Sequence, residues 1–137
     1  MVVRVLMLIH RKSGLTPQQF QKHYEEIHMP LTKEVAGETF PISHIRRYIP
    51  RSVSPQDSST EKKQYSAVVA WGNPADVEID CVTELIFRDK KHLQSYFEMP
   101  HAPGAAARLE AEAENFAEKY TTIIVEECRE TLGMSKL

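Results

Sequence analysis

The chain has 137 residues, of which 17 are Lys or Arg and 19 are Asp or Glu, so its formal net charge is −2. A domain of this length buries about two-thirds of the surface that its unfolded chain exposes, so residues 1–137 are expected to fold as one domain without a disulfide or a metal ion. Both signs of charge are interspersed, which argues against nucleic acid or a membrane surface as a partner.

The first predicted element is a strand over residues 2–10. This segment is rich in Val, Leu and Ile with little alternation, which is typical of a strand that is apolar on both faces. No basic n-region precedes this apolar run and no small-residue cleavage site of a signal peptide follows it, and the run is far shorter than the roughly 18 residues of a membrane span. Cys81 and Cys128 form no CxxC pair. We therefore expect a cytoplasmic protein in a reducing compartment.

A helix is predicted from Thr16 to about His28. Thr16 is the N-cap, and Gln19 completes a capping box with it. The apolar stripe of this helix comprises Phe20, Tyr24, Ile27 and Leu31. Pro30 disfavours a helical conformation at the residue before it, so we expect a break or kink there and a last turn that ends near Gly37.

A second strand is predicted over residues 44–51, and its alternation places His44, Arg46 and Tyr48 on one face. Residues 52–64 are polar and predict a surface loop, whereas residues 65–71 predict a short extra strand. Together, residues 52–79 form a loop and insertion, for which we expect a role as a lid or a dimer contact.

The C-terminal half predicts a strand over residues 81–88, two helices and a last strand over residues 120–128. Asp89 is the N-cap of the first helix, two prolines interrupt the helical region, and the second helix begins at Gly104. The apolar positions are Leu93, Tyr96 and Phe97 in the first helix and Leu109, Ala113 and Phe116 in the second.

The order of elements predicts an α+β fold, the ferredoxin-like split βαβ arrangement with one antiparallel sheet and helices on one face. The other face of the sheet would be bare. Because Val82 and Ile86 of the third strand alternate onto one face while the first strand is apolar on both, a second copy is the simplest cover. We therefore expect a homodimer whose two sheets form a shared barrel-like core.

Three stretches resemble the EthD domain family, a branch of the dimeric α+β barrel superfamily. They are residues 11–20 (RKSGLTPQQF) with His23-Tyr24 and residues 28–31 (HMPL), residues 80–89 (DCVTELIFRD), and residues 114–116 (ENF). The resemblance covers most of the chain except residues 52–79. It implies a homodimeric barrel with a pocket between sheet and helices in each subunit, usually without a metal or organic cofactor. Family members and their relatives include decarboxylases, dehydratases and cyclases of aromatic polyketides, lactone isomerases and monooxygenases, so the fold does not select the reaction.

His28 is the first candidate catalytic residue. It matches the family's His-x-Pro-Leu motif and flanks the apolar stripe four residues after Tyr24. Unpaired carbonyls at the helix end before Pro30 would favour the imidazolium, so we expect a raised pKa and a role as proton donor. The alternative is a histidine that only caps those carbonyls.

The polar face of the second strand supplies further candidates. If it lines the pocket, Tyr48 would hold a phenol or carbonyl oxygen, His44 would relay a proton and Arg46 would pair with a carboxylate. The alternative is a solvated sheet edge. Glu84, in an apolar strand context, matches a family carboxylate and is expected to act in catalysis or to orient a histidine.

Aromatic residues are candidates for the pocket wall, with a core role as the alternative: Tyr24, Trp71, Phe87 and Phe97. His101 lies between two prolines, where a pocket mouth or lid could form, although this position favours an ordinary surface-loop histidine. The six histidines show no HxH or HExxH spacing, so no metal site is expected. Hydrolase, dinucleotide and P-loop motifs do not occur.

The leading hypothesis is a cofactor-independent lyase, a decarboxylase of an aromatic polyketide carboxylic acid in secondary metabolism, with His28 as general acid and base. Dehydration or aldol cyclisation would use the same groups, and the sequence does not separate these reactions. The further alternatives are a non-catalytic dimeric binding protein and a monooxygenase of haem or of an anthrone-like phenol. The identity of the substrate is not readable from the sequence.

Overall fold

The computed structural model describes residues 1–53, 65–99 and 103–134. Its main sheet has the strand order β2-β5-β1-β6, and every neighbouring pair is antiparallel. The strands are β1 (Val3–Arg11), β2 (Ser43–Tyr48), β5 (Cys81–Phe87) and β6 (Ala117–Val125). The central strands β1 and β5 belong to different halves of the chain, as in the predicted ferredoxin-like split βαβ fold.

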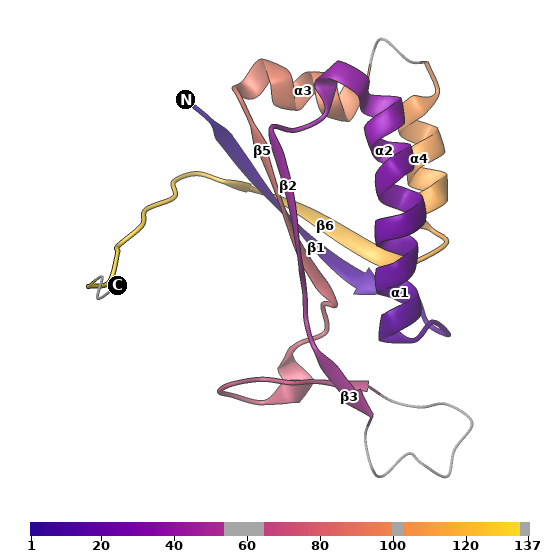
Figure 1. The fold of residues 1–137 in the computed structure, drawn as a ribbon, viewed down its shortest axis with the longest axis vertical. Coiled ribbons are helices and arrows are strands. Elements are labelled where there is room, and N and C mark those ends of the chain that lie inside the picture. Colours follow the sequence, from indigo (N-terminus) through magenta and orange to yellow (C-terminus); the bar gives the residue numbers. More distant parts are fainter. Residues whose placement is uncertain (54–64, 100–102, 135–137) are drawn as a thin grey trace.

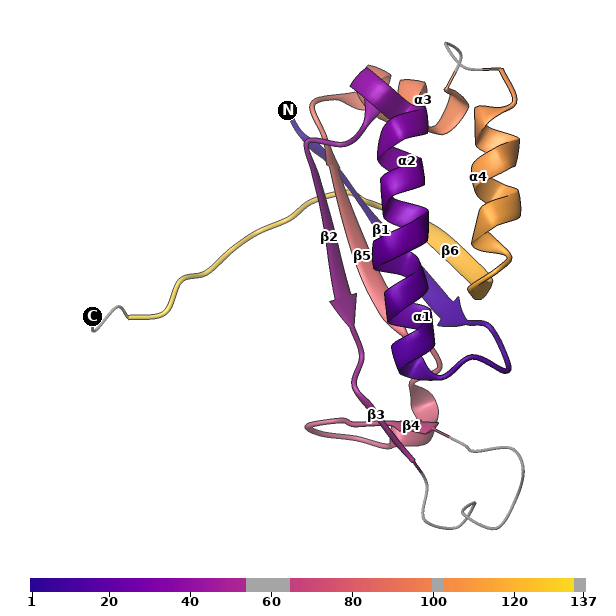
Figure 2. The same cartoon turned by 45° about the vertical axis from the view of Figure 1, so that its right-hand side comes forward.

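The helices pack on one face of this sheet (Figures 1 and 2). They are α1 (Pro17–His23), the π-helical turn η1 (Tyr24–His28), α2 (Met29–Ala36), the 3-10 turn η2 (Gly37–Thr39), α3 (Lys90–Glu98) and α4 (Ala105–Ala113). The predicted caps are present, because Thr16 and Gln19 form a capping box at α1 and Asp89 accepts from the backbone N–H of His92 at α3. None of the helices in the described part of the chain is both long and apolar enough to cross a membrane.

Of the break or kink expected before Pro30, the break does not occur. The chain widens instead into one π-helical turn, η1, and continues as α2 to Ala36. Proline lacks an N–H and its ring crowds the carbonyl of the preceding turn, and the wider turn fits here because the N–H of Met29 bonds the carbonyl of Tyr24, five residues back. His28 therefore lies within a continuous helical segment and not at a helix end.

The two faces of the sheet differ in their cover. On the helix side, Val5, Leu85 and Phe87 are fully buried. The opposite face, here called the open face, carries apolar side chains that no helix of the described residues covers: Leu6, Leu8, Ile45, Val82, Ile86 and Ile123. This alternation in β1 and β5 explains why β1 is apolar at almost every position.

The insertion contains a small two-stranded sheet, β3 (Arg51–Val53) with β4 (Tyr65–Ala67), and the 3-10 turn η4 (Pro74–Asp76). β4 is shorter than the predicted strand over residues 65–71. Arg51 attaches the insertion to the main sheet, since its Nε lies 2.6 Å from Oδ1 of Asp80 and its Nη2 donates to the carbonyl of Ile79. The segment between β4 and η4 and the tail after β6 both extend toward the side of the open face (Figures 1 and 2).

Candidate active site

A wide cavity lies between the helix side of the sheet and the helices α2, α3 and α4. Its volume is about 880 Å³, and its wall is mainly apolar. β1 contributes Val3, Val5, Met7 and Ile9, and Leu93, Leu109 and Phe116 close the opposite side. The cavity exists because α4 covers only part of β6, which leaves Tyr120 and Ile124 exposed on the helix side. Such a cavity is large enough for a polycyclic small molecule.

Few polar side chains line this cavity. His28, Tyr24 and Thr32 come from the η1 turn and α2, and the buried Tyr96 comes from α3. The other polar residues of the lining are exposed: Lys90, Gln94, Glu98, Glu110, Tyr120 and Thr122. The hydroxyl of Thr32 donates to the carbonyl of His28 and is thereby occupied. The imidazole of His28 is therefore the group best placed for acid–base chemistry inside the cavity.

The pKa of His28 is lowered and not raised as predicted. Burial lowers its pKa to about 4, although the carboxylate of Glu112 opposes the shift. The predicted increase is wrong because the ring is buried, and burial disfavours its charged form. Nδ1 of His28 is buried and has no hydrogen-bond partner among the described residues. At neutral pH the ring is an uncharged base.

Glu112 on α4 lies between two histidines. Its Oε1 is 2.5 Å from Nε2 of His23 and 3.9 Å from Nδ1 of His28, while Oε2 accepts a hydrogen bond from Asn115 Nδ2 at 2.8 Å. Burial disfavours the charged form of Glu112, but the hydrogen bonds from His23 and Asn115 outweigh it and hold its pKa below the ordinary value. The sequence analysis missed Glu112 as a site residue, because its contact with His23 joins residues 89 positions apart.

Tyr24 lines the cavity with its ring, as expected for the pocket wall. Its hydroxyl points into the sheet and forms a 3.0 Å hydrogen bond with Thr83 Oγ1. Burial raises the pKa of this phenol. The ring packs edge-on against that of His28, with 5.8 Å between the centroids, so Tyr24 orients the imidazole.

The polar face of β2 also points toward the helices, but its groups bind one another and do not line the cavity. Arg46 donates to both carboxylate oxygens of Glu25, Nε to Oε2 at 2.5 Å and Nη2 to Oε1 at 3.0 Å. The hydroxyl of Tyr48 donates to the same carboxylate, and Nδ1 of His44 accepts from Arg46 Nη1 at 2.8 Å. The catalytic roles predicted for His44 and Tyr48, and substrate binding by Arg46, therefore have no geometric support in this cavity.

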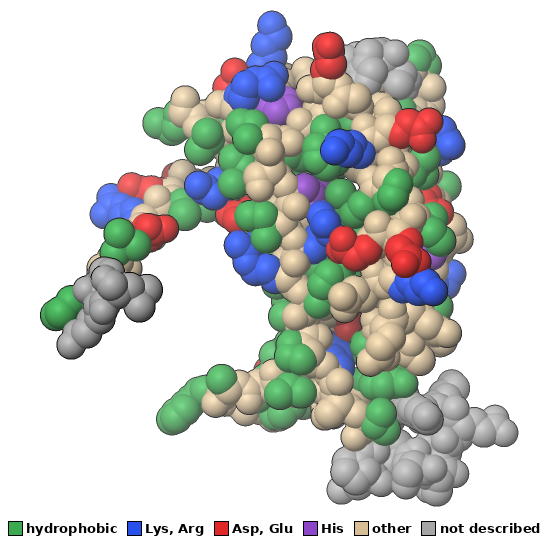
Figure 3. Space-filling view, viewed as in Figure 1, with side chains coloured by type: hydrophobic (Ala, Val, Ile, Leu, Met, Phe, Trp, Pro, Cys, Tyr) green, Lys and Arg blue, Asp and Glu red, His purple; other side chains and the backbone are tan. Residues whose placement is uncertain are grey.

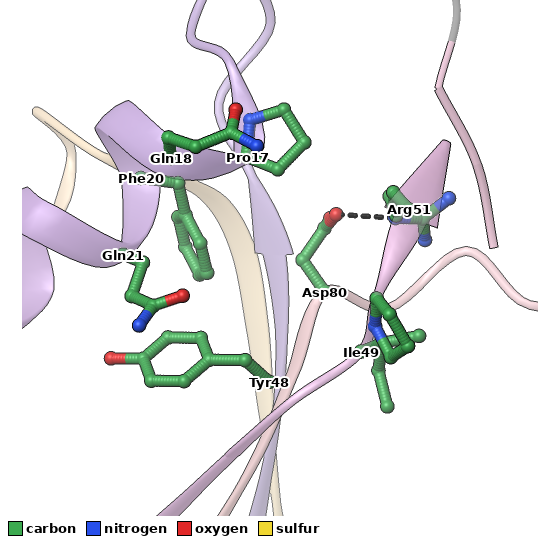
Figure 4. Close-up of a pocket in the computed structure, with 9 residues that line it drawn as sticks. Pro17, Gln18, Phe20, Gln21, Tyr48, Ile49, Arg51 and Asp80 are labelled. Atoms are coloured by element: carbon green, nitrogen blue, oxygen red, sulfur yellow. Dashed lines mark ion pairs between the residues drawn. The ribbon is translucent and has the colours of Figure 1, made fainter. Parts of the chain in front are cut away.

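This Glu25 cluster (Glu25, His44, Arg46 and Tyr48) holds η1 against β2. The hydrogen bonds from Arg46, with a smaller one from Tyr48, lower the pKa of Glu25, although burial opposes them. Burial and the neighbouring charge of Arg46 lower the pKa of His44 to about 4. Tyr48 also borders a second, smaller cavity of about 390 Å³ beside Gln18 and Gln21 of α1, where Arg51 pairs with Asp80 (Figure 4).

Other predicted site residues lie elsewhere. Glu84 is on the open face, where Arg4 and Arg47 pair with it at 3.3 and 3.4 Å, so the sheet separates it from the cavity. Trp71 is 95% exposed on the insertion, and Phe87 is a core residue that does not line the cavity. Phe97 does line it. His101 lies outside the described residues.

No group of three or more His, Cys, Asp or Glu is placed to hold a metal ion within residues 1–53, 65–99 and 103–134. What the cavity offers is a mainly apolar enclosure with one imidazole, that of His28, in its wall. Such a site can bind an apolar ring system and transfer a proton.

The comparison with known sequences agrees with the motifs in α1, η1 and β5. Residues 12–120 match the EthD domain. The chain belongs to the EthD domain family. Among curated proteins, none matches it significantly.

Solved structures of EthD proteins and of other ferredoxin-like proteins share the fold. An EthD family protein from Bacillus halodurans is 21% identical, with a TM-score of 0.57, covering 93% of this chain and 100% of that one. A dimeric ferredoxin-like protein of unknown function from Thermobifida fusca is 12% identical, with a TM-score of 0.51 and coverage of 91% and 90%. The hydroxynitrile lyase of Passiflora edulis is 15% identical, with a TM-score of 0.53 and coverage of 94% and 97%. At these identities the likeness shows the fold of this EthD protein and not its reaction.

Proposed function

We propose that this EthD protein is a cofactor-independent lyase that removes carbon dioxide from an aromatic polyketide carboxylic acid. The observation that supports the proposal is the 880 Å³ apolar cavity with the imidazole of His28 in its wall. A polycyclic aromatic acid matches both the size and the lining of this cavity. The fold is compatible with such chemistry, since the neighbour from Passiflora edulis is itself a lyase.

The reaction has two parts. The bond between the ring carbon and the carboxylate breaks, carbon dioxide leaves, and the electron pair moves into a neighbouring carbonyl to give an enolate. The ring carbon that carried the carboxylate then takes a proton from Nε2 of His28. An apolar enclosure favours the first part, because it disfavours the localised charge of a carboxylate more than the delocalised charge of an enolate. A positioned proton donor contributes about 10²–10⁴-fold to the second.

Dehydration or aldol cyclisation of a related polyketide is the second candidate reaction. The observation in its favour is the lowered pKa of His28, which makes the neutral ring a base at pH 7 that can remove a proton beside a carbonyl. The two reactions differ in the molecule that is released, carbon dioxide or water.

The proposal includes a homodimer formed through the open face of the sheet. Leu6, Val82 and Ile123 lie on this face, and Arg4 and Glu84 supply a paired charge between them. The insertion and the tail extend to the same side and carry exposed apolar residues, among them Trp71, Leu132 at 80% and Met134 at 86% exposed (Figure 3). The neighbour from Thermobifida fusca is described as dimeric. A two-fold contact would cover these apolar side chains in both copies.

The decisive experiment incubates the purified protein with an anthrone-type polyketide carboxylic acid in the presence of a metal chelator and follows the product mass. We expect accelerated loss of carbon dioxide, which the His28→Ala variant reduces by about 10²–10⁴-fold. Glu26→Gln is the matched control, since this carboxylate lies on the same turn but is exposed. Loss of water would instead favour the second reaction. Absence of both reactions, or normal activity of His28→Ala, would refute the proposed mechanism and leave binding as the function.

A further inference from the structure

Three side chains form a continuous polar path from the cavity to the surface. His28 lies at the cavity, Glu112 lies behind it, and His23 lies beyond Glu112 on α1. Oε1 of Glu112 faces both rings, at 2.5 Å from Nε2 of His23 and 3.9 Å from Nδ1 of His28. The side chain of His23 is 21% exposed and that of His28 is 15% exposed, so the outer ring has the better access to water.

The path is held in place on two sides. Asn115 donates to Oε2 of Glu112, so the carboxylate presents its other oxygen to the histidines. The ring of Phe116 stacks on His23 with 5.1 Å between centroids and packs against His28 at 4.8 Å. Both imidazoles therefore lie against one aromatic side chain, which fixes their separation from Glu112.

We propose that Glu112 and His23 are positioning residues that form, with His28, a proton relay between solvent and the cavity. The inference rests on the proposed role of His28 as the proton-transfer group. It goes further by naming the route through which that group exchanges its proton.

No step of this proton transfer requires a charged His28. Nδ1 of His23 takes a proton from water, and its Nε2–H passes to Oε1 of Glu112. Oε1 then gives a proton to Nδ1 of His28, whose Nε2–H moves to the enolate carbon of the substrate. The reverse sequence removes a proton from a substrate and restores the starting tautomers. The 3.9 Å gap must shorten by about 1 Å, as is common when catalytic hydrogen bonds tighten on ligand binding.

A relay is needed because the buried cavity makes a charged His28 unfavourable. Burial makes a free imidazolium costly at His28, with a pKa of about 4, so direct protonation from neutral solvent is rare. Transfer through the ring from Nδ1 to Nε2 avoids that state. The titratable and charged groups that face His28 are Glu112 from α4, His23 from α1, Tyr24 from η1 and His44 from β2.

The test measures proton exchange between the ring N–H of His28 and water by ¹⁵N NMR, which requires no substrate. We expect His23→Gln, which keeps a donor for Glu112 but cannot pass a proton, to slow this exchange by about tenfold or more. His23→Ala should be equally slow and recover when imidazole buffer is added. Glu112→Gln should be slow with or without imidazole, and Glu26→Gln should match the native protein.

The same variants are then assayed for turnover. The relay predicts a lower kcat at unchanged KM for His23→Ala, with a rate that rises with imidazole concentration. Equal exchange rates in all variants, or exchange slowed without any rescue of His23→Ala, would overturn the relay. If the variants show the expected exchange rates by NMR but the protein shows no turnover, the proposed lyase function is refuted and the relay is retained.

Discussion

Acid should destabilise this protein through His28 before most carboxylates titrate. The ring has a pKa of about 4 in the folded protein and 6.5 as its ordinary value. Between these values the unfolded chain binds a proton that the folded protein excludes, so the free energy of unfolding falls as the pH falls from about 6.5 toward 4. Above pH 6.5 both states are neutral at this ring, and it adds no pH dependence.

The size of this loss of stability follows from the difference between the folded and the ordinary pKa of His28. Each pH unit in which the unfolded state holds one extra proton costs about 1.4 kcal/mol, so the 1.5 units from pH 6.5 to pH 5 cost about 2 kcal/mol. Urea denaturation at pH 7.5 and pH 5 measures this loss. In His28→Gln, which cannot titrate, the loss should be smaller than in the native protein by about 2 kcal/mol.

A companion variant tests the same reasoning on the other side of Tyr24. Burial and Arg46 lower the pKa of His44 to about 4 as well, so His44→Gln should also reduce the acid sensitivity. If native protein and His28→Gln lose equal stability between pH 7.5 and pH 5, His28 is not buried as a neutral ring, and the account of the cavity is refuted.

Three further predictions concern the Glu25 cluster, the cavity and the open face. Tyr48→Phe removes the hydrogen bond to Glu25 and should lower the free energy of unfolding by about 1 kcal/mol, measured in urea. An unchanged value would mean that the cluster does not hold η1 against β2. Leu109→Trp places a large ring in the cavity and should abolish binding of an aromatic acid, measured by calorimetry, at a cost of about 1–3 kcal/mol in stability. Native affinity in this variant would show that the ligand binds elsewhere. Ile123→Lys puts a charge on the open face and should weaken the homodimer at least about tenfold, which light scattering over a dilution series would detect. A dimer of native strength would place the contact on another surface.

Periodicity and capping in the sequence determined the type of most elements. The alternation in residues 81–88 and the capping box at Thr16 depend only on near neighbours, and both are present in the structure as predicted. The ferredoxin-like arrangement with one antiparallel sheet followed from the order of elements, because few arrangements of two βαβ halves exist. The resemblance to the EthD domain family was confirmed over residues 12–120.

Predictions made from neighbouring residues failed where contacts between distant residues determine the structure. Pro30 predicts a break or kink, but the helix continues through a π-helical turn. Burial of His28 then lowers its pKa instead of raising it. The predicted face of His44, Arg46 and Tyr48 does point toward the helices, yet Glu25 occupies its polar groups.

The sequence by itself therefore determined the fold class, the family and the choice of His28, since these depend on patterns along the chain. Only the tertiary structure decided which side chains share the cavity. Glu112 reaches His28 because α4 packs beside η1, and Glu84 is excluded because one position in a strand separates the two faces of a sheet. Contacts between distant elements, and the burial that they cause, set the chemistry of this site.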